Sequence, residues 1–254
     1  MLFVALYLNF QQSVFIFVMI YARLAIIFYM LPVLGERVLS NLIIKNTLIS
    51  LTIIGLWPCL ATTVMPEQGW LIILIKESII GLILASSLCL PFWVAIGLGE
   101  ILDNQRGASI SDSIDPVNGV QSSILSSFLN FALGAIFFAS GGMRLLMEVM
   151  VQSYEMLPRG SSLDGIHWEQ AGQLVTVLMQ NSILLAAPVM LVMMVAEMLL
   201  GVFARYCPQL NPFSLSLTIK SFIAFAIFLF YGFQSLSEKP LQMFSISGFQ
   251  QFIS

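Results

Sequence analysis

Six long apolar segments constrain the fold of this chain more than any other feature of its sequence. They cover roughly residues 13–34, 42–64, 71–98, 124–143, 174–203 and 213–233. Each is long enough to cross a bilayer as a helix, which needs about 20 mostly apolar residues. Only 9% of the 254 residues are charged, whereas soluble domains carry about 25%. The sequence therefore predicts an all-α polytopic membrane protein, with residues 1–254 in a single domain.

Prolines interrupt four of these segments, at Pro32, Pro58, Pro91 and Pro188. Proline lacks a backbone N–H, so it tends to kink or stop a helix. A short turn with two further prolines, residues 207–212, joins the last two segments. We therefore expect kinked helices that pair as hairpins.

The sequence lacks the motifs of the common enzyme and cofactor classes. There is no HExxH zinc motif, no Walker A motif and no Gly-x-Ser-x-Gly nucleophile motif, and His167 is the only histidine. Cys59, Cys89 and Cys207 are scattered, without the spacing of a metal site or a disulfide framework. The net charge of −3 offers no basic surface for nucleic acid. We expect a non-enzymatic protein with no cofactor, no metal and no nucleic-acid partner.

One polar stretch, residues 100–119, separates two apolar segments and holds five of the chain's 23 charged residues. Arg106 and Gly107 predict the end of a helix, because a cation suits the carbonyl end and glycine adopts the left-handed conformation after it. Asp115 and Pro116 predict the start of the next helix. By composition alone this stretch is either a functional loop or an ordinary solvated connector. A second polar stretch, about residues 152–170, predicts an aqueous loop.

Five charged residues lie inside apolar segments, namely Arg23, Lys76, Glu77, Glu197 and Lys220. A charge that faces lipid at the bilayer centre costs at least about 2.5–3.5 kcal/mol, so these side chains must face protein or water, or lie outside the hydrocarbon. Lys76 and Glu77 are adjacent and point to different helix faces, which leaves one for a bond within the chain and the other for a partner. Arg23 has a further alternative, which is to snorkel to the membrane surface.

Glu197 and Lys220 lie at similar distances from the turn between the last two segments. Glu197 is 11 residues before Pro208 and Lys220 is 12 residues after it, so an antiparallel hairpin brings them to nearly the same depth. We predict an intramembrane ion pair that fixes the register of the hairpin, because ionisable groups in membranes usually pair. The alternative is that neighbouring subunits satisfy each side chain separately.

Several motifs together resemble those of one family. They are Pro-Phe-Trp at residues 91–93, Asp-Asn-Gln-Arg-Gly at 103–107, Asp-Pro-Val-Asn-Gly at 115–119 and Pro-Gln-Leu-Asn-Pro-Phe-Ser at 208–214. With them, the chain resembles the FliR/SctT family over essentially its whole length. This family comprises export-apparatus subunits of bacterial flagella and type III secretion systems. The likeness is closer to the virulence branch, SctT (SpaR or YscT), than to the flagellar one.

The resemblance implies a structural and gating subunit of a type III protein export gate in the bacterial inner membrane. It implies assembly with SctR (FliP-like) and SctS (FliQ-like) subunits into a helical cone, with SctU (FlhB-like) attached and SctV (FlhA-like) beneath. The inner-rod protein and, transiently, unfolded secreted proteins are further implied partners. In this family, helical hairpins are lifted out of the bilayer and packed on partner subunits.

The resemblance also places the polar loop, about residues 100–123, in the pore lumen as a plug. The candidate gating residues that follow are Asp103, Asn104, Gln105, Arg106, Gly107, Ser109, Ser111, Asp112, Asp115, Pro116, Asn118 and Gly119. A stand-alone ion-coupled secondary transporter is the alternative, since broken helices with intramembrane charges are typical of that class. An assembly scaffold with no role in the lumen is a third possibility.

Overall fold

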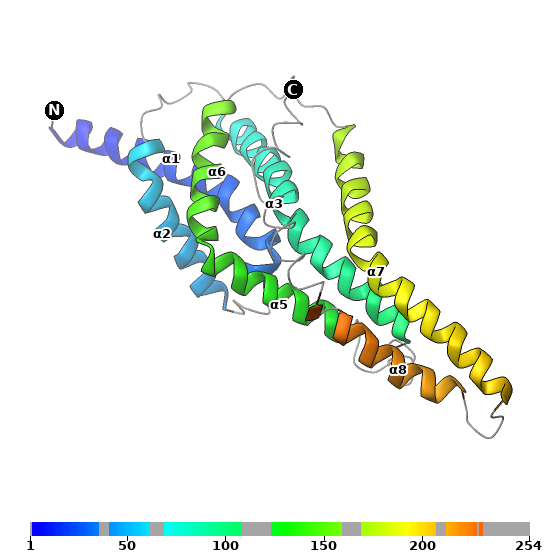
Figure 1. Ribbon diagram of the computed structural model, residues 1–254. Helices are drawn as coiled ribbons and strands as arrows, with labels where there is room; N and C mark the ends of the chain where they lie inside the picture. Colours follow the sequence, from blue (N-terminus) through cyan, green and yellow to red (C-terminus); the bar gives the residue numbers. More distant parts are fainter. Residues whose placement is uncertain are drawn as a thin grey trace, which may run out of the picture. The chain divides into compact units, whose positions relative to one another are not determined.

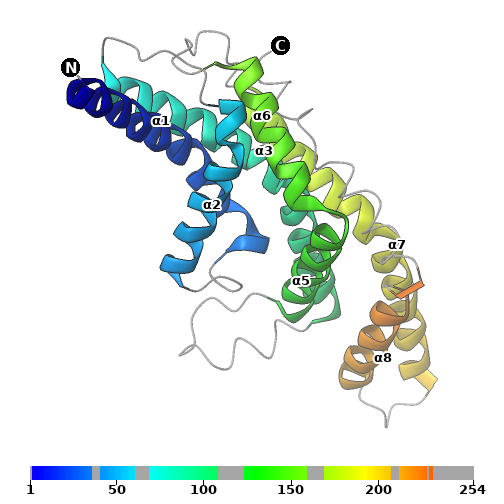
Figure 2. The same ribbon diagram turned by 90° about the vertical axis from the view of Figure 1, so that its left-hand side faces the viewer.

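The computed structural model describes residues 2–35, 41–60, 69–107, 123–158, 169–206, 212–227 and 229–230. These residues form helices, and no strand occurs among them (Figures 1 and 2). In chain order they are α1 (Leu2–Met30), the 3-10 helix η1 (Pro32–Leu34), α2 (Leu42–Leu60), α3 (Trp70–Arg106), α5 (Ile124–Ala139), α6 (Gly142–Met156), α7 (Gln170–Tyr206) and α8 (Pro212–Ile227). The all-α prediction is confirmed, and the described part of each predicted apolar segment is mainly helical.

One helix, α6, lies almost entirely outside the predicted apolar segments. Its sequence is amphipathic, because its buried positions recur every three or four residues along one face, at Leu146, Val149, Met150, Ser153 and Tyr154. The chain breaks between α5 and α6 at Gly141, which has a left-handed φ of 76°. A helix of this kind forms because one of its faces packs against protein. Its apolar residues are spaced along that face, so they do not form a continuous apolar run in the sequence.

Among the described residues, three helices are long and apolar enough to cross a membrane, and the bent pair α5–α6 makes a fourth if it counts as one span. The three are Asn9–Met30 of α1, all of α3, and Gly172–Tyr206 of α7. Two predicted segments form shorter helices within the described residues, α2 and α8. At 1.5 Å per residue, the 16 residues of α8 extend about 24 Å, less than the roughly 30 Å of a hydrocarbon core.

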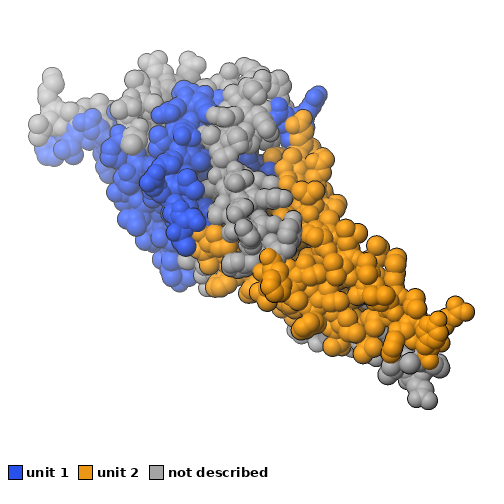
Figure 3. Space-filling model, viewed as in Figure 1, with its two compact units in different colours: residues 1–90, 137–171, 243–254 blue, residues 91–136, 172–242 orange. Residues whose placement is uncertain are grey.

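The chain divides into two compact units, each built from separated segments (Figure 3). Unit 1 contains Met1–Leu90, Phe137–Ala171 and Met243–Ser254, and unit 2 contains Pro91–Ile136 and Gly172–Gln242. The helices α3, α5 and α7 each contribute residues to both units. The boundaries at residues 90/91, 136/137 and 171/172 fall inside helices, so no linker composition marks them.

In unit 1, α1 packs against α2, and α2 packs against α6 (Figure 1). The first half of α3 crosses α1 at Gly81, where a Cβ atom would lie 2.7 Å from the carbonyl oxygen of Arg23. Small residues at such crossings let membrane helices approach closely. The α1 residues in the core are fully buried: Ile20, Leu24, Ile27 and Phe28.

In unit 2, the second half of α3 packs closely against α5 and α7. A Cβ atom on Gly99 would collide with the backbone of Ser126 at the start of α5. A Cβ atom on Gly97 would lie 2.8 Å from Oγ of Ser182 on α7. The hydroxyl of Ser182 donates a hydrogen bond to the carbonyl oxygen of Val94 on α3, at 3.3 Å. The helix α8 runs back along the C-terminal half of α7 (Figures 1 and 2).

The prolines act in two ways. Pro32 follows the end of α1 and begins η1, which agrees with the predicted helix stop. Pro58, Pro91 and Pro188 lie inside α2, α3 and α7 and do not stop them. Prolines are tolerated inside membrane helices because neighbouring groups satisfy the carbonyls that lose a partner.

Candidate functional site

The helix α3 ends at the start of the polar loop, as the sequence predicts. Arg106 is its last residue, and Gly107 has a left-handed φ of 79° and donates its N–H to the carbonyl oxygen of Asn104 at 3.1 Å. Nε of Arg106 lies 2.6 Å from Oδ1 of Asp103, which is one helical turn earlier. Both side chains are largely covered, with 12% and 4% of their surface exposed. The loop therefore begins at a rigid helix end.

Two carboxylates of α3 fasten the far end of the same loop. Oδ2 of Asp103 accepts a hydrogen bond from the N–H of Leu125 at 3.0 Å, and Oε1 of Glu100 accepts one from the N–H of Ser123 at 3.1 Å. Ser123 precedes α5, and its Oγ accepts the N–H of Ser126 at 3.0 Å. These bonds satisfy N–H groups that have no partner inside α5 and place negative charge at its positive end.

We call this group the neck of the polar loop, and it consists of Glu100, Asp103, Arg106, Ser123 and Leu125. The predicted candidates Asp103 and Arg106 are in it, whereas the side chain of Asn104 is exposed and that of Gln105 is half-buried. Glu100 and Ser123 were not among the candidates. A serine directly before an apolar run is a helix-start signal that would have found Ser123. The remaining candidates lie outside the described residues: Ser109, Ser111, Asp112, Asp115, Pro116, Asn118 and Gly119.

A third helix, α8, contacts the neck through an aromatic ring. Cζ of Arg106 lies 5.4 Å from the centroid of the Phe225 ring, within the range of a cation–π contact. The guanidinium of Arg106 thus has a carboxylate on one side and a ring on another. Nothing in the sequence indicates this contact, because 119 residues separate the two (225 − 106).

The same helix is tied to α7 by Lys220 and Glu197. Nζ of Lys220 lies 2.8 Å from Oε2 of Glu197, so the two charged groups meet as the spacing about the turn predicts. The pair is asymmetric, since the side chain of Lys220 is 8% exposed and that of Glu197 is 54% exposed. The buried cation therefore depends on this carboxylate more than the carboxylate depends on the cation.

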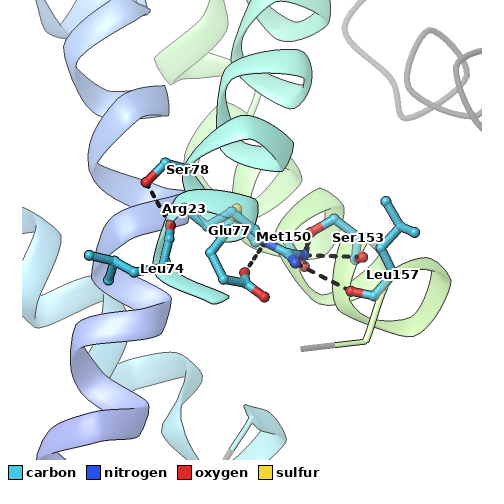
Figure 4. Close-up of polar contacts among 7 residues, drawn as sticks. All are labelled: Arg23, Leu74, Glu77, Ser78, Met150, Ser153 and Leu157. Atoms are coloured by element: carbon cyan, nitrogen blue, oxygen red, sulfur yellow. Dashed lines mark hydrogen bonds and ion pairs between the residues drawn. The ribbon is translucent and has the colours of Figure 1, made fainter. Parts of the chain in front are cut away.

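Arg23 of α1 lies in a fully buried polar cluster in unit 1 (Figure 4). Its Nε is 2.8 Å from Oε2 of Glu77 on α3. Nη1 donates to both the carbonyl oxygen and the Oγ of Ser153 at 3.2 Å, and Nη2 donates to the carbonyl oxygen of Leu157 at 3.3 Å. Cζ also lies 3.8 Å from the centroid of the Tyr154 ring. One side chain therefore joins α1 to α3 and to the carbonyl end of α6, where a cation is favoured.

This cluster confirms that Arg23 faces protein, and it corrects the start of the second polar stretch. Arg23 does not snorkel, because it is 0% exposed and its charge is satisfied by protein groups. The predicted aqueous loop begins later than residue 152, since α6 continues to Met156 and its last turn is held by Arg23. The adjacent Lys76 and Glu77 do point to different faces: Glu77 is fully buried, whereas Lys76 is half-buried.

The carboxylates of both sites act as hydrogen-bond acceptors and ion-pair partners, not as a set of converging metal ligands. Within the described parts of the chain, no three His, Cys, Asp or Glu side chains gather in a way that could hold a metal ion. The arrangement joins helices and fastens a loop.

Comparison with known proteins agrees with these features. The model of the family "Bacterial export proteins, family 1" matches residues 14–242. The surface presentation of antigens protein SpaR of Salmonella typhimurium is 35% identical over 95% of this chain and 92% of its own length. SpaR of Shigella flexneri is 40% identical over 83% of this chain and 82% of its own length. Yop proteins translocation protein T of Yersinia pestis is 28% identical over 92% of this chain and 92% of its own length. With apolar helices of membrane-spanning length, the chain is therefore an all-α membrane protein of the bacterial export proteins, family 1, the FliR/SctT family of type III secretion.

Proposed function

We propose that this secretion-apparatus subunit forms part of the inner-membrane pore through which unfolded proteins are exported, and that its polar loop gates the pore. The role is structural and not enzymatic. The relatives' names support a secretion apparatus, since they refer to presentation of surface antigens and translocation of Yop proteins. They give no support to a stand-alone transporter.

The observation that carries the gating proposal is the neck. Glu100 and Asp103 hold Ser123 and Leu125 at the end of α3, so both ends of the polar loop are fastened at one place. A mere connector between two helices does not need two carboxylates directed at the start of the second helix. A gate does, because a plug must return to the same position after each opening.

The length of the loop is consistent with a plug. Residues 108–122 number 15, and a chain spans at most about 3.3–3.6 Å per residue. A loop that leaves the neck and returns to it therefore reaches no further than about 25 Å from it. That reach is enough for the loop to close a pore that passes beside the neck and is wide enough for an unfolded chain. The loop cannot close a pore that lies further away than this reach.

The exposed apolar surface of the chain supports an assembly with partner subunits in the membrane. Only 28% of the apolar window in α7 is buried within the chain, compared with 72% in α3. We propose that SctR-like and SctS-like subunits cover much of this surface, with SctU-like and SctV-like proteins and the inner-rod protein as further neighbours. Co-purification with a tagged chain tests this proposal: a chain that is recovered folded and alone contradicts it.

Deletion of residues 109–114 tests the gating role. In a bacterial strain that carries the complete export apparatus, the deletion should increase the uptake of a small hydrophilic dye several-fold without loss of assembly. Deletion of residues 161–166, six residues of the second polar stretch, is the matched control and should leave dye uptake unchanged. Normal permeability in a correctly assembled 109–114 deletion would refute the plug and favour a scaffold.

A further inference from the structure

The neck is held by more than its own two helices, because Arg106 also contacts α8. The carboxylate of Asp103 is shared: Oδ1 is 2.6 Å from Nε of Arg106, and Oδ2 accepts the N–H of Leu125. The ring of Phe225 covers the guanidinium at 5.4 Å. A continuous series of contacts therefore runs from α8 through α3 to the first turn of α5.

This series gives Phe225 a specific effect on the neck. Arg106 has only 12% of its side chain exposed, and its Cζ lies over the ring of Phe225, which is itself 43% exposed. A ring attracts a guanidinium through its quadrupole, whereas an aliphatic side chain only excludes water. Replacing the ring with an aliphatic side chain therefore frees Arg106 to turn towards solvent, and Asp103 loses the partner that orients it towards Leu125.

The ion pair in the middle of α8 fixes where that ring lies. Lys220, five residues before Phe225 on the same helix, is paired with Glu197 on α7. A displacement of α8 relative to α7 therefore moves Phe225 relative to Arg106. The contact of Phe225 with Arg106 therefore couples the hairpin α7–α8 to the neck, in addition to the packing of α3 on α7 at Gly97 and Ser182.

We propose that Phe225 is a positioning residue for the polar loop: its ring holds Arg106 on Asp103, so that the position of α8 sets how firmly the neck is closed. The consequence for export rests on the proposed gating function. The effect on the neck itself does not.

Hydrogen exchange in the purified export complex tests the proposal, because the N–H of Leu125 is bonded to Asp103 and reports directly on the neck. In Phe225→Leu, the peptide that carries Ser123 and Leu125 should exchange about three- to tenfold faster, the effect expected for loss of one cation–π contact. Phe225→Tyr keeps a ring face and should exchange at the original rate. Phe222→Leu is the matched control, since Phe222 lies on the same helix and is 76% exposed.

Equal exchange in Phe225→Leu and the unsubstituted complex would overturn the proposal, as would equal acceleration in Phe225→Leu and Phe225→Tyr. If Phe225→Leu fails to assemble, Phe225→Met, which is closer in volume and also lacks a ring, takes its place. Dye uptake separates the two proposals. Faster exchange without a leak in the 109–114 deletion removes the gating function and leaves the positioning role. A leak in the 109–114 deletion without faster exchange in Phe225→Leu removes the positioning role and leaves the gating function.

Discussion

Substitution of Arg23 by methionine should be among the most destabilising single changes in this protein. The substitution removes four hydrogen bonds to Glu77, Ser153 and Leu157 and the contact with the Tyr154 ring. It also removes the cation that lies 2.8 Å from the fully buried carboxylate of Glu77. Removing one partner of a buried ion pair typically costs about 3–5 kcal/mol, and we expect a loss of unfolding free energy in that range.

The change at the other partner should be milder. Glu77→Gln keeps an oxygen that can accept the Nε–H of Arg23, and the guanidinium retains its bonds to the carbonyl end of α6. Because a charge-assisted bond is roughly twice as strong as a neutral one, we expect a cost of about 1–3 kcal/mol. The double substitution Arg23→Met and Glu77→Leu should be less destabilising than the sum of the two single changes, by about 1–3 kcal/mol, since it removes both charged groups of the ion pair.

Pulse proteolysis of the tagged chain in detergent-solubilised membranes measures these differences, because it follows one subunit within a complex across a denaturant titration. Arg144→Met is the matched control: it removes an ion pair with Glu148 one helical turn away, but the two side chains are 82% and 47% exposed. Its cost should not exceed about 0.5 kcal/mol. A cost for Arg23→Met no larger than that of Arg144→Met would refute the reasoning, as would additive effects of Arg23→Met and Glu77→Leu.

Two further predictions concern helix contacts and use the same measurement. Gly81→Ala should destabilise the protein by about 1–3 kcal/mol, because its Cβ would lie 2.7 Å from a carbonyl oxygen of α1. Gly201→Ala, where nothing lies within 4 Å, should stabilise it by about 0.5–1 kcal/mol; equal effects would contradict the close crossing. Glu197→Gln should cost about 1–3 kcal/mol, since its amide oxygen can still accept from the buried Lys220 but no longer carries the negative charge of the ion pair. Lys220→Met should cost less than about 1 kcal/mol, because the carboxylate it leaves is half exposed; the reverse order would show that Glu197 is the buried partner in the assembled protein.

Local features of the chain were predictable where their cause is local. The apolar runs predict helices because a membrane helix must satisfy its own backbone. The end of α3 follows from Arg106 and Gly107 alone, since a cation and a left-handed glycine both favour a carbonyl end. The contact of Glu197 with Lys220 follows from equal distances to one turn. Each of these depends on fewer than about 40 consecutive residues and on one helix or one hairpin.

The contacts that join the helices were not predictable, because their partners are remote in sequence. Arg23 could be recognised as a costly charge, yet its partners lie 54, 130 and 134 residues away. In the same way, Glu100 and Asp103 cap a helix that starts more than 20 residues later, and Phe225 comes from another hairpin. The sequence by itself determined the class of the protein and the ends of several elements, since burial cost and helix geometry act locally. Only the tertiary structure decided which buried groups meet, because side chains find their hydrogen-bond partners through the packing of whole helices.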